Sequence, residues 1–145
     1  MMEQETLAPT SDDKTLAFLA QFLQVFTWFI GPLVIYVVKR ESRFVAFHAM
    51  QALLWQVVYF VLSMICMALF FVTFFMSAAS RGGPQSPSQG PPVAFLIFFP
   101  LIWLMMMGGW VLTLVIGIVF GIRAMRGEWA AYPIIGRWAR RIIGA

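Results

Sequence analysis

Three long apolar stretches, separated by short polar segments, dominate the pattern of residues along this chain. Residues 16–38, 44–77 and 93–122 contain no Asp, Glu, Lys or Arg. A helix needs about 20 apolar residues to cross the roughly 30 Å hydrocarbon core of a bilayer, and each stretch is longer than that. The pattern predicts an all-α integral membrane protein with three transmembrane helices, at about 16–38, 44–78 and 93–122.

The segments around these spans predict how the chain is organised. We expect an acidic N-terminal tail over residues 1–15, a three-helix membrane domain over 16–125 and a basic amphipathic C-terminal helix over 126–145. The connection 79–92 is rich in Gly, Pro and Ser, which is typical of a flexible loop.

The second and third spans are longer than the hydrocarbon core requires, so they must tilt, kink or project beyond it. Pro removes a backbone donor and clashes with the preceding turn, and adjacent Gly residues weaken a helix. The expected kink sites are Gly31 with Pro32 in the first span, and Pro100 and Gly108 with Gly109 in the third.

The C-terminal segment has two chemically different helical faces. One face carries Ile134, Ile135, Trp138 and Ile142, and the other carries Arg137, Arg140 and Arg141. A basic amphipathic helix with Trp at its boundary suits the interface of an anionic cytoplasmic leaflet, so Arg137, Arg140, Arg141 and Trp138 are the candidate membrane-surface residues. We favour the simpler interpretation that this tail only anchors and orients the third span.

The distribution of basic residues predicts the orientation in the membrane. Eight of the ten Lys and Arg residues follow the first or the third span: Lys39, Arg40, Arg43, Arg123, Arg126, Arg137, Arg140 and Arg141. Basic residues near spans favour the cytoplasmic side. We therefore expect a multi-pass protein of the prokaryotic plasma (inner) membrane with its N-terminus outside and its C-terminus in the cytoplasm. The net charge of +4 is explained by orientation, and we expect no nucleic-acid partner.

Polar side chains of the first two spans are confined to one side of each helix. His48, Gln51, Gln56, Tyr59 and Ser63 fall within about 140° of arc in the second span, and Gln21 and Gln24 share one face of the first. A polar group without a partner in hydrocarbon costs several kcal/mol, so the two faces are expected to meet as a polar interhelical face. For His48 this favours a structural hydrogen bond, with a pH-sensitive or substrate-contacting role as the alternative.

Small residues recur every four positions in the third span. Gly109, Thr113, Gly117 and Gly121 form this stripe, and Gly117 to Gly121 completes a G-x-x-x-G pattern. Such stripes let another helix backbone approach closely. An intramolecular partner is favoured, and contact with a second copy or with another protein remains open.

The chain carries few groups that could do chemistry. No carboxylate lies between Glu41 and Glu128, and no second His, Cys, Asp or Glu is spaced to complete a metal site with His48. Nucleophile-elbow and phosphate-loop motifs are absent from the sequence. We expect a protein that is not an enzyme and that has no cofactor or metal.

Four segments together resemble a known family. They are SDDKTLA at 11–17, GPLVIY at 31–36, FVAFHAMQAL at 44–53 with Gln56, and IRAMRGE at 122–128 followed by Tyr132 and Pro133. The chain resembles a widespread prokaryotic family of small membrane proteins that is related to the twenty-kilodalton component of the chloroplast inner-envelope protein import translocon. The resemblance implies a helical membrane bundle and participation in protein translocation or in a larger membrane assembly.

Two functional hypotheses follow. The first is a non-enzymatic accessory or scaffold subunit of a membrane complex, of translocon-like type or another, with the lipid bilayer and protein partners or further copies of itself as its contacts. The alternative is a small oligomeric channel or transporter whose pathway follows the Gln51, Gln56, Tyr59 and Ser63 face of the second span.

Overall fold

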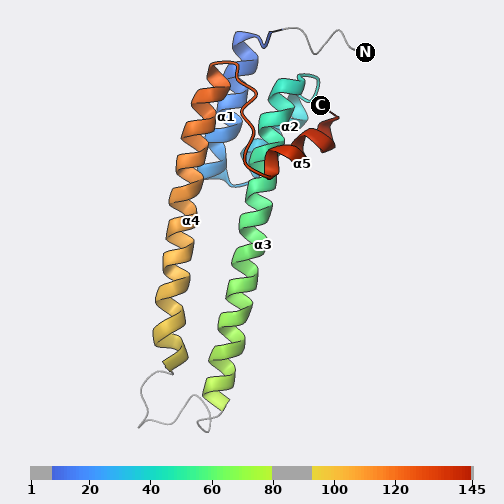
Figure 1. The fold of residues 1–145 in the computed structure, drawn as a ribbon. Helices are drawn as coiled ribbons and strands as arrows, with labels where there is room; N and C mark the ends of the chain where they lie inside the picture. The colour runs from blue at the N-terminus through green and yellow to red at the C-terminus, as the bar shows by residue number, and fades with distance from the viewer. Residues whose placement is uncertain (1–7, 80–92, 145) are drawn as a thin grey trace. The chain divides into compact units, whose positions relative to one another are not determined.

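The computed structural model describes residues 8–79 and 93–144, and every regular element in these two ranges is helical. The elements are α1 (Ser11–Thr27), α2 (Ile30–Val38), α3 (Arg43–Ala79), α4 (Val93–Met125) and α5 (Ile135–Ile143) (Figure 1). The prediction of an all-α protein is confirmed. The expected flexible loop lies outside the described residues, apart from Ala79 at the end of α3.

The chain divides into two compact units. The first consists of Met1–Val58 and Val111–Ala145, and the second of Tyr59–Trp110. Helices α3 and α4 each contribute one part to either unit. We describe the two units separately.

The prediction of one transmembrane helix over residues 16–38 is wrong, because the chain turns between α1 and α2. Trp28 has φ = 57°, which ends α1 three residues before the expected Gly31 and Pro32 kink. Pro32 instead lies in the first turn of α2, where a missing N–H costs no helical hydrogen bond. Among the helices of residues 8–79 and 93–144, only α3 and α4 are long and apolar enough to span a membrane.

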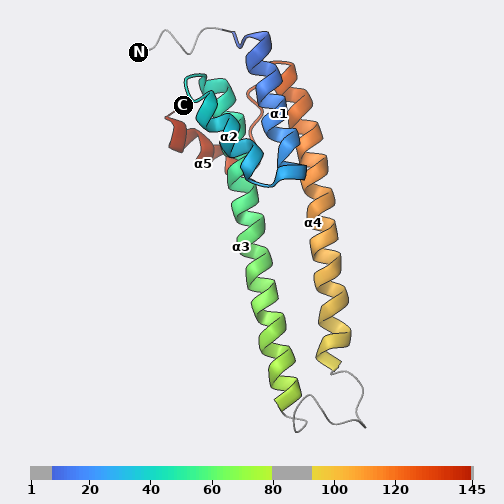
Figure 2. The ribbon, with the colours of Figure 1, turned by 180° about the vertical axis from the view of Figure 1, so that it is seen from behind.

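Helices α1 and α2 form an antiparallel hairpin, which is held by hydrogen bonds at the turn and by apolar contacts farther from it. The Thr27 hydroxyl donates to the carbonyl of Leu23 (2.9 Å) and accepts from the N–H of Gly31 (3.0 Å), which joins the two helices at the turn. Farther from it, Ala20 and Ile35 share a core cluster with Val45 and Ala49 at the start of α3. The hairpin is visible from both sides in Figures 1 and 2.

Helix α1 begins at Ser11, inside the segment expected to be an acidic tail. Thr10 and Asp13 form a capping box, in which the hydroxyl of Thr10 accepts from the N–H of Asp13 and the Asp13 carboxylate accepts from the N–H of Thr10, each at 3.2 Å. Burial opposes ionisation of Asp13, but hydrogen bonds from Thr10 and Ser42 and the charge of Lys39 lower its pKa.

Helix α3 has 37 residues and α4 has 33, so their lengths are about 55 and 50 Å at 1.5 Å per residue. Both exceed the hydrocarbon core, as the sequence predicted. Pro100, Gly108 and Gly109 all lie inside α4. No break in the helix occurs at these expected kink sites.

The second unit is held by aromatic and backbone contacts between the distal halves of α3 and α4. The Tyr59 hydroxyl donates to the carbonyl of Met106 (3.0 Å). The ring of Phe95 lies beside those of Phe70 and Phe74, with centroids 6.3 and 6.2 Å away. Most other large apolar side chains of this unit are exposed. Such a surface is typical of lipid-facing helices.

Candidate functional site

Five of the candidate polar residues are buried together in the first unit. Gln21 and Gln24 come from α1, and His48, Gln51 and Gln56 from the first half of α3, and each is at most 4% exposed. Their partners include the segment between α4 and α5, residues 126–134, which we call the strap. This buried group of amides and one imidazole, with the strap that it holds, is the candidate site.

Gln51 fixes the strap by pairing with its backbone. Its amide nitrogen donates to the carbonyl of Ala130 (3.2 Å), and its amide oxygen accepts from the N–H of Tyr132 (2.6 Å). These two bonds reproduce the pairing of a neighbouring β-strand. Ala130 and Tyr132 are the buried residues of the strap, and these two bonds satisfy backbone groups that water does not reach.

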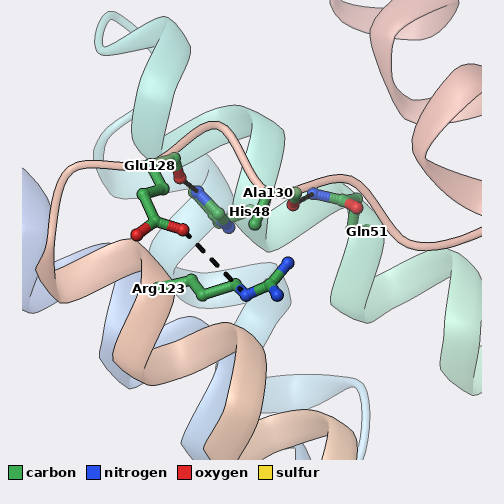
Figure 3. Close-up of polar contacts among 5 residues, drawn as sticks. All are labelled: His48, Gln51, Arg123, Glu128 and Ala130. Atoms are coloured by element: carbon green, nitrogen blue, oxygen red, sulfur yellow. Dashed lines mark hydrogen bonds and ion pairs between the residues drawn. The ribbon is translucent and has the colours of Figure 1, made fainter.

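His48 is hydrogen-bonded at both ring nitrogens. Nε2 lies 3.2 Å from the carbonyl oxygen of Glu128, which can only accept, so the proton belongs on Nε2. Nδ1 lies 3.4 Å from the amide nitrogen of Gln21, which donates to it and also to the backbone carbonyl of His48 (3.1 Å). The geometry is that of a neutral imidazole dedicated to holding the strap (Figure 3).

Tyr132 closes the network from the strap side. Its hydroxyl donates to the amide oxygen of Gln21 and accepts from the amide nitrogen of Gln24 (3.3 Å). Burial raises the pKa of Tyr132 well above its ordinary value, against the opposing effect of the hydrogen bonds from Gln24 and Gln21. The phenol therefore stays neutral as a donor and acceptor.

Gln56 completes the group from farther along α3. Its amide nitrogen donates to the backbone carbonyl of Gln24 (2.9 Å). The amide oxygens of Gln24 and Gln56 are buried without a hydrogen-bond partner. Every other side-chain polar atom of the five residues takes part in a described contact.

The glycine stripe packs against helices of the same chain. A Cβ at Gly117 would lie 2.8 Å from the backbone oxygen of Gln21, and one at Gly121 would lie 2.9 Å from Cδ2 of Phe18, so both glycines face α1. Thr113 accepts from the indole N–H of Trp55 on α3 (2.9 Å). In the second unit Gly109 lies against the ring of Tyr59.

Two residues of the predicted polar face lie outside the buried group. Tyr59 and Ser63 belong to the second unit, where Tyr59 bonds to α4 and the hydroxyl of Ser63 donates to the carbonyl of Tyr59 (2.8 Å). Neither shares a site with His48.

Sequence reasoning missed the strap as the partner of the polar face. The sequence predicted a helix over residues 126–145, whereas α5 begins at Ile135; Tyr132 therefore entered only as part of a family motif, and Trp129 was not considered. The ring of Trp129 packs against Phe44 and Phe47 at centroid distances of 5.3 and 5.4 Å. One feature of the sequence could have pointed to the strap. Tyr132 is an aromatic residue directly before Pro133, in a segment where Gly and Pro disfavour a helix. An exposed ion pair between Arg123 and Glu128 (4.0 Å) spans the start of the strap.

Comparison with known families identifies the chain's relatives. The model of the magnetosome magnetite crystal formation protein family (MamF/MmsF) matches residues 12–139, which is most of the chain. The chain belongs to this family. No curated protein and no solved structure matches it.

Membership of the MamF/MmsF family agrees with two apolar helices of membrane-spanning length, and the chain is a small prokaryotic membrane protein. The match contains the five residues of the buried group and the whole strap. A relation to the chloroplast translocon component stays a prediction.

The site offers structural chemistry rather than reactive groups. Apart from the amide oxygens of Gln24 and Gln56, its amides, neutral imidazole and phenol form hydrogen bonds with one another or with the protein backbone. Within residues 8–79 and 93–144, no three His, Cys, Asp or Glu side chains gather closely enough to hold a metal ion.

Proposed function

We propose that this protein takes part in magnetite crystal formation as a non-enzymatic accessory or scaffold subunit of a membrane complex. Family membership supports the role in magnetite crystal formation, and the two long apolar helices support a location in the membrane. The observation that carries the scaffold role is the buried group itself, in which His48 and Gln51 bond to the backbone of the strap. A protein built this way acts through the surfaces that it presents.

The same observation disfavours the channel hypothesis. Gln51 and Gln56 are two of its four expected lining residues. Both amide atoms of Gln51 bond to the strap backbone, and the amide nitrogen of Gln56 donates to the Gln24 carbonyl of α1. A hydrated pathway needs polar groups that face water, and these groups face protein. Translocation-type assemblies remain one kind of complex in which such a scaffold subunit would work.

Complementation of a deletion strain tests the function. We expect deletion of the gene in its magnetite-forming host to change the number or dimensions of the crystals in electron micrographs, and the unaltered gene to reverse the change. His48→Gln keeps a donor for the Glu128 carbonyl and is expected to complement whenever the protein accumulates to normal levels. Normal accumulation without complementation would point to chemistry at His48 and contradict the scaffold role.

We further propose a membrane topology that differs from three crossings. Because α1 and α2 form a hairpin, Thr10 and Lys39 lie at the same end of it, where Asp13 interacts with Ser42 and Lys39. A Cβ at Gly127, just after α4, would lie 3.0 Å from Cε of Lys14. Nine of the ten basic residues belong to segments near this end, all except Arg81. The positive-inside rule then assigns both chain ends to the cytoplasmic side, with α1 and α2 as a re-entrant hairpin and α3 and α4 as the two crossings.

Single-cysteine labelling distinguishes the two topologies. In a Cys66→Ser background, we expect A8C and A145C to react with a membrane-impermeant maleimide from the same side, and Q85C to react from the opposite side. The cytoplasmic side is identified by comparing intact with permeabilised spheroplasts. Labelling of A8C and A145C from opposite sides would restore the three-span interpretation and refute the re-entrant hairpin.

A further inference from the structure

Helix α5 lies on the first unit through one narrow face. Ile135, Gly136 and Ala139 are buried there, the guanidinium carbon of Arg140 lies 5.5 Å from the centre of the Phe47 ring, and Arg43 donates to the carbonyl of Gly144 (3.4 Å). Figure 2 shows α5 beside the first turns of α3. Arg140 thus has a docking role, although the sequence placed it with the membrane-surface arginines.

A second face of α5 is apolar and exposed. Ile134, Trp138 and Ile142 follow one another at intervals of four residues, and they are 61%, 48% and 56% exposed. Trp138 and Ile142, four residues apart, lie on the same side of the helix, and Ile134 precedes the helix as its N-cap, so we call the three residues the apolar stripe. About half or more of the surface of each side chain is therefore left uncovered by its own chain.

The backbone conformation of Ile134 gives a second reason to expect a contact outside the protein. Its φ is 68° and its ψ is −59°, a conformation that is strained for a β-branched residue and accessible to Gly. An exposed isoleucine in a strained conformation does not stabilise the first unit through packing. An apolar medium outside the protein would give its side chain a favourable contact.

Arg137 and Arg141 form the adjacent row and are exposed, and no acidic residue occurs between Trp129 and Gly144. An apolar stripe beside an uncompensated basic row fits the boundary between anionic headgroups and acyl chains. We propose that Ile134, Trp138 and Ile142 insert into an anionic leaflet while Arg137 and Arg141 bind its lipid phosphates. This inference rests on the membrane location in the proposed function.

Lipid-quenching measurements on the full chain test this inference. The chain, in a Cys66→Ser background with a fluorophore on I142C, is reconstituted into phosphatidylglycerol or phosphatidylcholine bilayers that carry a shallow nitroxide lipid. We expect stronger quenching in phosphatidylglycerol, and about fivefold weaker partitioning of α5 into the bilayer for each of Arg137→Gln and Arg141→Gln. A fluorophore on A8C, before α1, is the aqueous control.

Ile134→Gly separates lipid contact from folding. Glycine relieves the strain at φ = 68°, so this variant should unfold no more easily than the parent, yet show weaker quenching at residue 142. Sodium carbonate extraction reports independently whether the chain is membrane-integrated. The inference would be overturned if the chain is membrane-integrated but its probe is quenched equally in both lipids. It would also be overturned if another protein shields the probe from both lipid and water. Either result would leave the proposed function standing. A chain extracted by carbonate would overturn both.

Discussion

Gln51→Leu is expected to destabilise the first unit by about 2–6 kcal/mol, because it leaves two buried backbone groups without partners, each costing about 1–3 kcal/mol. The groups are the carbonyl of Ala130 and the N–H of Tyr132, both in buried residues of the strap. Without the two hydrogen bonds from Gln51, the strap and α5 should separate from α3. Thermal unfolding in a mild detergent measures the loss, and faster tryptic cleavage after Arg126 reports release of the strap.

The matched control for this variant is Gln56→Leu, the same substitution on the same helix. Gln56 makes one bond, to the Gln24 carbonyl, and its amide oxygen is already buried without a partner. Leucine removes that bond together with the unpaired oxygen, so we expect a cost of about 1 kcal/mol or less. Equal losses for the two variants would mean that Gln51 contributes only ordinary burial and that the strap is held elsewhere.

Helix content and the apolar character of α3 and α4 were predictable from the sequence, because long charge-free runs have few alternatives. The break in the first span was not. Residues 16–38 satisfy every criterion of length and hydropathy, and the turn depends on a positive φ at Trp28, a residue type with no preference for that conformation. The predicted N-terminal orientation assumed three crossings, and it stays a prediction.

The sequence predicted which polar residues form the candidate site, but only some of the groups to which they bond. The shared faces of Gln21, Gln24, His48 and Gln51 follow from helical periodicity. Periodicity says nothing of an irregular segment 80 residues away, and the His48 to Glu128 and Gln51 to Ala130 bonds cross that separation. Likewise, Arg140 belongs to the basic face by its position in the sequence, but the nearby Phe47 ring makes it a docking residue.

Gly117→Ala is expected to destabilise the chain by about 1–3 kcal/mol, because the new methyl group cannot be accommodated by a rotamer change. It would lie 2.8 Å from the backbone oxygen of Gln21, so α1 itself must move. Gly121→Ala should cost less, since the obstructing Phe18 ring can rotate, and Gly108→Ala, which meets nothing within 4 Å, should stabilise by about 0.5–1 kcal/mol through helix propensity. Detergent unfolding midpoints of the three alanine variants test this order. A Gly117→Ala midpoint as high as that of Gly108→Ala would mean that α4 does not pack on α1, and would return the stripe to a second copy of the chain or another partner.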